Sequence, residues 1–214
     1  MIKAVVFDAG ETLINEARLY RHWAEYVNVP EHVFFASLGA IIQNREHHLE
    51  MFQLLTPGFD LAKAREERVQ QKTPDRFEER DLYPDAAPAI RAIHAMGLRV
   101  AIAANQPQSF EATMRACNLP IEFVASSTRW GVAKPAPEFF KRIIDELQLP
   151  PAEIAYVGDR TDNDIVPAKQ AGMFTVFIRR GPWGFIQARF EEAQLADLRI
   201  EGLLELPEAL ARLN

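Results

Sequence analysis

Short apolar runs rich in β-branched residues recur along the chain, and they predict buried strands. Four clear runs and a weaker one lie at Ile2–Phe7, Arg99–Ala104, Ile154–Val157, Phe174–Ile178 and, as the weaker one, Glu122–Ala125. Helical patterns separate them at Ala86–Met96, Ser109–Cys117, Pro137–Leu147 and Asp162–Ala171. Strands that alternate with helices pair in parallel and are covered on both faces. We therefore predict the α/β class with a doubly wound parallel sheet.

One long segment interrupts this alternation. Between residues 16 and 82, apolar side chains such as Tyr20, Trp23 and Val27 follow helical spacing, and no convincing strand occurs. Pro30, the turn at residues 56–58 and Thr73-Pro74 divide the segment into about four helices. We predict an all-helical domain at residues 16–82, inserted into an α/β core made of residues 1–15 and 83–214.

Composition narrows the range of functions. The chain has 214 residues and a formal net charge of −6, without the basic patch that nucleic-acid binding requires. No apolar run approaches the ~18 residues that span a membrane. The start of the chain lacks the basic segment and cleavage site of a secretion signal. We expect a cytoplasmic protein that binds neither nucleic acid nor membranes.

Candidate chemistry follows the predicted strands, because ligands of open α/β sheets bind beyond the carboxyl ends of the strands. Asp8 comes directly after the first strand. It is either a functional carboxylate, acting as nucleophile or metal ligand, or a residue that caps a helix or forms a turn. Asp159, Asp162 and Asp164 follow the fourth strand. Such a cluster suits a hard cation, although acidic residues in a first helical turn also complement the helix dipole.

Two further polar residues follow the other strands. Lys134 precedes the helix that Pro137 opens, and it is either a phosphate contact or an ordinary solvated charge. Asn105 follows the strand that ends at Ala104. Its side chain is suited either to donate to an oxyanion or to form a local turn.

Taken together, the order of these residues resembles the haloacid dehalogenase (HAD) superfamily, most members of which are phosphatases. The matching residues are Asp8 with Thr12, Lys134 with Pro135, and Gly158-Asp159 with Asp164. The resemblance covers essentially the whole chain. The inserted helical segment resembles the cap domain of that family, and Tyr83-Pro84-Asp85 resembles its return to the core.

The resemblance implies a reaction and a cofactor. Asp8 would attack phosphorus and form an aspartyl-phosphate that water then hydrolyses. Mg²⁺ would be held by Asp8, the carbonyl of Gly10 and Asp159, with Asp164 as a direct or water-mediated ligand. Lys134 would neutralise charge on Asp8 and on the phosphoryl group. The implied substrate is a small phosphorylated metabolite.

Two positions depart from the family pattern. Gly10 stands where the phosphatases of the family have a second Asp, which protonates the leaving group. General acid–base groups of this kind contribute roughly 10²–10⁴-fold in rate. Ala104 stands where the family has Ser or Thr, and one lost oxyanion donor costs roughly 10²–10³-fold. Glu11 is adjacent to Gly10 but points in another direction, whereas Asn105 offers an amide that compensates for the missing hydroxyl. We expect Mg²⁺-dependent phosphomonoester hydrolysis, at a rate that these departures lower.

Other functions remain open at this stage. The dehalogenases and phosphonate hydrolases of the superfamily also lack the second Asp. Dehalogenases need no metal, so the retained Asp159 and Asp164 argue against that chemistry. Phosphonate hydrolases use a cap lysine, and Lys63 and Lys72, the only lysines in the inserted segment, lie in strongly charged runs. A third alternative is a non-catalytic protein that binds a phosphorylated ligand.

The inserted segment is expected to select the substrate. Its candidates are Tyr20, Trp23, Arg45, His47 and His48. Adjacent histidines cannot share one helix face, which disfavours a metal pair, and the sequence does not single out any of the five.

Overall fold

The computed structural model describes residues 1–72 and 75–213, so the predicted break at Thr73-Pro74 lies outside the described residues. The chain divides into two compact units, residues 1–15 with 79–214, and residues 16–78. The second unit ends at Glu78, four positions before the expected boundary. Leu82 belongs to the first unit because it forms a backbone bridge with Ile14.

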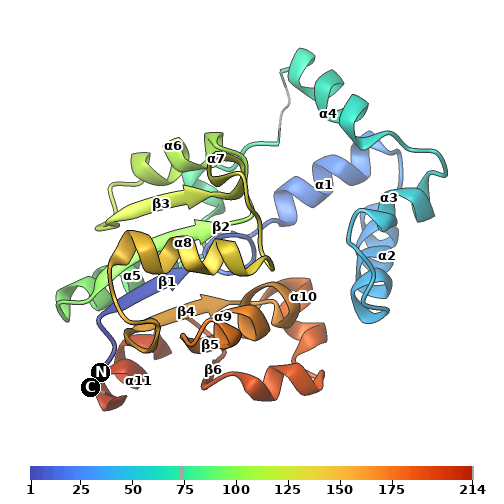
Figure 1. Ribbon diagram of the computed structural model, residues 1–214. Helices are drawn as coiled ribbons and strands as arrows, with labels where there is room; N and C mark the ends of the chain where they lie inside the picture. Colours follow the sequence, from blue (N-terminus) through green and yellow to red (C-terminus); the bar gives the residue numbers. More distant parts are fainter. Residues whose placement is uncertain (73–74, 214) are drawn as a thin grey trace. The chain divides into compact units, whose positions relative to one another are not determined.

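The first unit contains a six-stranded sheet in which all neighbours pair in parallel (Figure 1). Its order is β3-β2-β1-β4-β5-β6, which confirms the predicted fold class. The strands are β1 Ala4–Phe7, β2 Arg99–Ala104, β3 Phe123–Ser126, β4 Ile154–Gly158, β5 Phe174–Ile178 and β6 Leu198–Ile200. Strand β6 was not predicted, because its three residues are too few to give a clear alternating pattern.

The chain reverses its direction of travel across the sheet at β1. After β1 it adds β2 and β3 on one side, then returns to the other side of β1 with β4, β5 and β6. The space beyond the carboxyl ends of β1 and β4 is therefore the switch point where such sheets bind ligands.

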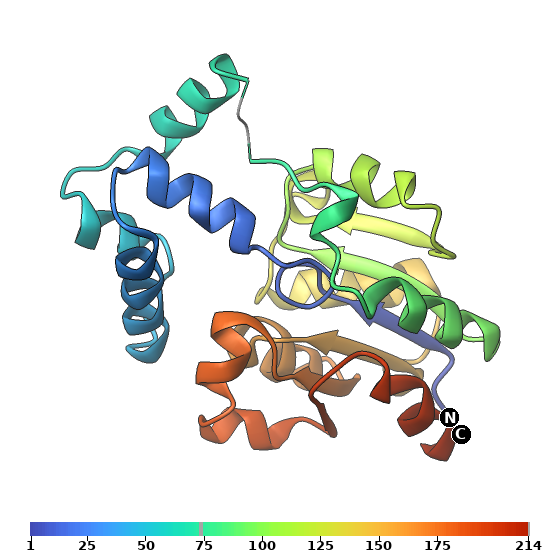
Figure 2. The ribbon, with the colours of Figure 1, turned by 180° about the vertical axis from the view of Figure 1, so that it is seen from behind.

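Helices cover both faces of the sheet. Alternate residues of β1 and β4, such as Val6 and Tyr156, pack against Phe139 and Phe140 of α8. The helices α8 and α9 lie on the face seen in Figure 1, and α5 and α11 lie on the face seen in Figure 2. The helices of this unit are α5 Ala86–Ala95, α6 Ser109–Ala116, α7 Ser127–Trp130, α8 Pro137–Leu147, α9 Val166–Gln170, α10 Gly181–Gln187 and α11 Glu205–Leu213.

The predicted helix at Asp162–Ala171 is wrong in its first half. Residues Thr161–Ile165 form a π-helical turn, and the α-helix α9 begins only at Val166. The amide of Ile165 donates to the carbonyl of Arg160, five positions back, at 3.2 Å. Pro167 has no N–H to close an ordinary α-helical bond at this point, so the wider turn precedes it.

The second unit is built from helices around an aromatic core. Its helices are α1 Ala17–Tyr26, α2 Glu31–Gln43, α3 Glu50–Leu55 and α4 Leu61–Gln70. Trp23 packs edge-on against Phe52 and Phe59, and the Arg68 guanidinium lies 4.5 Å from the Trp23 ring centre. Two candidate substrate residues, Tyr20 and Trp23, therefore contribute to packing within this unit. In the described part of the chain, no helix has the length and apolarity needed to cross a membrane.

Candidate active site

The register of the two central strands places Asp8 beside the acidic loop. Phe7 at the end of β1 pairs with Val157 of β4, so Asp8 and Gly158 are the next residues along the two strands. The amide of Asp8 donates to the carbonyl of Val157 at 2.9 Å. The chain then continues from Gly158 into Asp159. Both carboxylates thus emerge at the same edge of the sheet.

Three carboxylates meet at this edge. Asp8, Asp159 and Asp164 each offer an oxygen within 4.8 Å of the others, and all three side chains are buried. Asp162, the other acid of the loop, is instead held by the guanidinium of Arg160 at 2.5 Å. The structure therefore brings together the three acids that the resemblance selects and separates the fourth from them.

Lys134 lies between two of these acids. Its Nζ is 2.6 Å from Asp8 Oδ1 and 2.5 Å from Asp164 Oδ1, and its side chain is almost completely buried. Burial lowers the pKa of Lys134, but the charges of Asp164 and Asp8 more than offset this, so the pKa lies well above its ordinary value. Lys134 is thus a fixed cation that neutralises much of the charge on these two carboxylates.

Asp159 is the acid that Lys134 does not neutralise. Its Oδ2 is buried and has no hydrogen-bond partner within the described residues, and its Oδ1 accepts only a long 3.4 Å bond from Thr12 Oγ1. Burial, followed by the charges of Asp164 and Asp8, raises the pKa of Asp159 well above its ordinary value. Burial also raises the pKa of Asp164 to about 6, although Lys134 opposes the shift.

This donor set fits a magnesium ion. Mg²⁺ prefers oxygen ligands from one or two carboxylates and retains several waters. A buried carboxylate oxygen without a partner, beside two more carboxylates, is a position where a divalent cation would remove the cost of burial. Gly10 lies two residues after Asp8 and forms a backbone bridge with Ile14. That the carbonyl of Gly10 is a fourth metal ligand stays a prediction.

Gly158 makes the close packing of Asp164 possible. A Cβ atom at this position would lie 2.3 Å from Cγ and 2.4 Å from Oδ2 of Asp164. Asp164 is fully buried, and its Oδ2 also accepts the amide of Arg160 at 3.0 Å. The Asp164 carboxylate therefore has little freedom to move away from a larger residue at position 158.

Asn105 positions the lysine loop. Its side-chain oxygen accepts the amide of Lys134 at 2.8 Å, and its Nδ2 donates to the carbonyl of Lys134 at 2.9 Å. The sequence indicated either an oxyanion donor or a local turn at Asn105, and this contact across 29 positions is neither. Nδ2 of Asn105 carries a second N–H, and its donation to a substrate oxygen stays a prediction.

Glu11 is a buried residue whose partners the sequence did not indicate. Its Oε2 accepts the Tyr83 hydroxyl at 2.5 Å, and its backbone is left-handed with φ of 52°. Burial and the Glu11 charge raise the pKa of Tyr83 far above its ordinary value, so the phenol keeps its proton. Thr12 is also buried, and its carbonyl accepts Arg180 Nη1 at 3.0 Å. Contacts so distant in sequence leave no local signal.

The fold and the acid cluster define a protein of the α/β class with a carboxylate centre at the switch point of its parallel sheet. The family model described as haloacid dehalogenase-like hydrolase matches residues 2–172. The chain therefore belongs to this family, as the sequence motifs predicted, and it is a phosphatase-like hydrolase.

Individual relatives agree with this assignment. The chain is 26% identical to a glyceraldehyde 3-phosphate phosphatase of Methanopyrus kandleri, over 100% of this chain and 99% of that protein. It is 33% identical to a glyceraldehyde 3-phosphate phosphatase of Methanocaldococcus jannaschii, over 62% of this chain and 58% of the relative. The fold matches an L-2-haloacid dehalogenase of Xanthobacter autotrophicus, solved with chloropropionic acid covalently bound. That match has a TM-score of 0.68 at 19% identity and covers 99% of each chain.

Proposed function

We propose that this protein is a Mg²⁺-dependent phosphomonoester hydrolase that acts on a small phosphorylated metabolite through an aspartyl-phosphate on Asp8. One observation carries the metal dependence. Lys134 contacts Asp8 and Asp164, whereas the buried Oδ2 of Asp159 has no partner among the described residues. Three carboxylates and one lysine leave the cluster with a formal charge of −2, and the unpartnered oxygen of Asp159 is where a divalent cation would bind.

The side chains support covalent catalysis by Asp8. Its free carboxylate oxygen would attack phosphorus, the bond from phosphorus to the leaving oxygen would break, and water would later release inorganic phosphate and restore Asp8. Lys134, 2.6 Å from Asp8, would hold that carboxylate in place and stabilise charge on the phosphoryl oxygens. Mg²⁺, held by Asp8, Asp159 and Asp164 with the carbonyl of Gly10, would supply electrostatic stabilisation of the transferring phosphoryl group.

The leaving group would depart without a proton from position 10. Gly10 has no side chain, and the neighbouring Glu11 is hydrogen-bonded to Tyr83 and lies against Gly181. Glu11 is therefore not free to turn towards the leaving oxygen. This favours substrates whose leaving groups are stable as anions, and it keeps a second reaction open. Hydrolysis of a carbon–halogen or phosphonate bond also needs no proton donor at this position.

An assay with two substrate classes tests the proposal. We expect turnover of an activated aryl phosphate with Mg²⁺, little turnover of alkyl phosphates, and none of either with a chelator. Asp159→Asn should remove the activity by weakening Mg²⁺ binding. Asp145→Asn, which changes an exposed acid paired with Lys141 on α8, is the matched control. Metal-independent release of halide from a haloacid would instead favour the second reaction, and binding of phosphorylated ligands without turnover of any of these substrates would favour a binding protein.

A further inference from the structure

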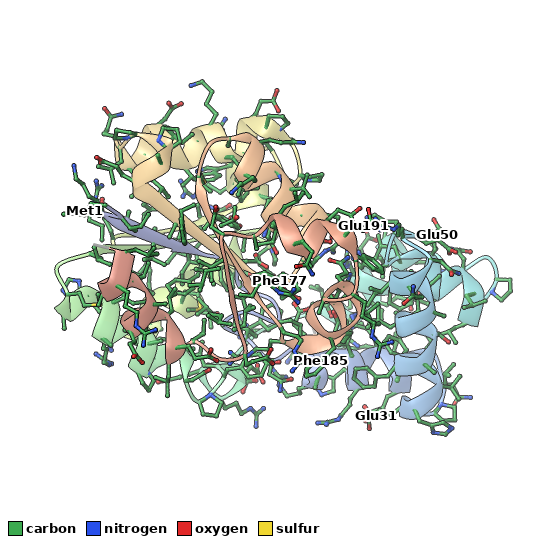
Figure 3. The ribbon with its side chains drawn as sticks, turned by 90° about the horizontal axis from the view of Figure 1, so that it is seen from below. Met1, Glu31, Glu50, Phe177, Phe185 and Glu191 are labelled. Atoms are coloured by element: carbon green, nitrogen blue, oxygen red, sulfur yellow. The ribbon has the colours of Figure 1, made fainter. Side chains whose placement is uncertain are left out.

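The short helix α10 contacts both loops that carry the acid cluster. It follows β5 and spans Gly181–Gln187 at the carboxyl edge of the sheet (Figure 1). Phe185, labelled in Figure 3, is exposed on this helix, whereas Trp183 and Gln187 are buried. The buried side chains of α10 therefore face the protein, and their partners are residues of the site.

Gln187 holds the start of the acidic turn. Its Oε1 accepts the amide of Thr161 at 2.6 Å and the Thr161 hydroxyl at 3.0 Å, and its Nε2 donates to Asp162 Oδ1 at 3.1 Å. Thr161 begins the π-helical turn that separates Asp159 from Asp164. The amide of Thr161 belongs to the first turn, where no backbone partner lies within the helix. Gln187 supplies the acceptor from 26 positions away.

Trp183 holds the same turn from another side. The Arg160 guanidinium lies 5.1 Å from the Trp183 ring centre and also pairs with Asp162. The backbone amide of Arg160 donates to Asp164 Oδ2 at 3.0 Å. The residue that fixes the Asp164 carboxylate is thus itself held against α10 through its side chain.

The start of α10 meets the nucleophile loop. Arg180 Nη1 donates to the carbonyl of Thr12 at 3.0 Å, and a Cβ on Gly181 would lie 2.4 Å from Glu11 Oε2. Gly181 has φ of 62°, a left-handed conformation that also favours glycine. One helix therefore packs against the loop that follows β1 and against the loop that follows β4.

We propose that α10 is a positioning element for the metal site, and that Gln187 is its positioning residue for Asp159 and Asp164. This proposal rests on the proposed function, because it assumes that these acids hold Mg²⁺. Without Gln187 Oε1, the buried amide and hydroxyl of Thr161 lose their hydrogen-bond acceptor. The turn Thr161–Ile165 would then have to open so that water can bind these groups. The two ligands at the ends of the turn would then lose their fixed separation, and small losses of geometry are costly for Mg²⁺.

Gln187→Met tests the proposal, because methionine keeps the length and approximate volume of glutamine but removes all three hydrogen bonds. The matched control is Thr175→Val, which breaks a partly buried hydrogen bond from the Thr175 hydroxyl to Asp197 that involves β5 but not the acid cluster. Calorimetric titration with MgCl₂ gives the dissociation constant, and thermal unfolding gives Tm. We expect both variants to lower Tm, but only Gln187→Met to raise the dissociation constant, by at least about tenfold. Equal dissociation constants for Gln187→Met and the wild type would overturn the proposal.

A metal-free measurement separates this proposal from the proposed function. Amide hydrogen exchange of Thr161 and Asp164, followed by NMR without Mg²⁺, reports the order of the turn itself. Faster exchange in Gln187→Met than in Thr175→Val would support the positioning role. If the wild type binds no Mg²⁺, the proposed metal site fails on its own, and unchanged exchange in Gln187→Met would then overturn the positioning role as well.

Discussion

Gly158→Ala should separate the Asp164 carboxylate from the acid cluster without changing any charge. The new Cβ would lie 2.3 Å from Asp164 Cγ and 2.5 Å from its Cβ. Carbon atoms in contact are about 3.5–4.0 Å apart, so a displacement of about 1 Å is required. Asp164 has no free space to enter, because it is fully buried and held by Lys134 and by the amide of Arg160.

The magnitude follows from this overlap. Overpacking of a rigid interior costs about 1–3 kcal/mol, which lowers the Tm of a chain of this size by about 2–12 °C. A ligand displaced by about 1 Å cannot keep the Mg²⁺ geometry, so we expect the Mg²⁺ dissociation constant to rise at least about tenfold. Turnover of an aryl phosphate should fall in parallel and recover partly at high Mg²⁺ concentration.

The control for this variant is Gly202→Ala. A Cβ at Gly202 has its closest neighbour, Asp85 Oδ2, at 3.4 Å, which is an ordinary contact. We expect Gly202→Ala to keep both the Tm and the Mg²⁺ affinity of the wild type. If Gly158→Ala also keeps both, Asp164 is not held against the strand end in the way described, and it cannot be a fixed ligand of the site.

Three further predictions concern the nucleophile, the missing acid and pH. Asp8→Asn should lower turnover by at least about 10³-fold because it removes the nucleophile. The protein should stay folded because Lys134 keeps Asp164 as a partner. Kinetics and Tm check the two outcomes. Gly10→Asp should raise turnover of alkyl phosphates by up to roughly 10²–10⁴-fold and turnover of aryl phosphates much less. The double variant Gly10→Asp with Glu11→Gly relaxes the loop around the new acid. Equal gains on both substrates would contradict the role of this acid in protonating the leaving group. The pKa of Asp164, raised to about 6, means that the metal-free folded state keeps a proton that the unfolded chain has lost above its ordinary pKa of 3.8. The contribution of Asp164 to metal-free stability should therefore fall by up to about 3 kcal/mol as the pH rises from 4 to 7, which denaturant titrations of the wild type and of Asp164→Asn measure as a difference. Mg²⁺ affinity should rise over the same range, which calorimetry measures.

Two of the three acids of the cluster were predictable because they directly follow strands. Asp8 and Asp159 follow runs whose apolar character is visible in the sequence, and parallel strands present their carboxyl ends at one edge. This inference needs only the apolar runs in the sequence and the parallel pairing of the strands. It therefore places Asp8 and Asp159 at one edge without any knowledge of their contacts, whereas Lys134 is separated from β3 by the short helix α7.

The supporting contacts were not predictable in the same way. Gln187 meets Thr161 across 26 positions, and Tyr83 meets Glu11 across 72. Each depends on the packing of an element whose own sequence carries no chemical pattern. Asn105 was predicted as a substrate contact, and the partner of its side chain is the backbone of Lys134, which only the folded structure identifies. Local patterns thus predict which groups occupy an edge, but not what holds them there.

Phosphoryl transfer to Asp8 can be observed by trapping the covalent intermediate. The protein is mixed with an aryl phosphate and Mg²⁺, quenched with acid within milliseconds, digested, and its peptides are sequenced by mass spectrometry. We expect a phosphoryl group on Asp8 in the peptide that contains this residue, and no phosphoryl group when a chelator replaces Mg²⁺. Turnover without phosphorylated Asp8, or a phosphoryl group on another residue, would rule out covalent catalysis by Asp8.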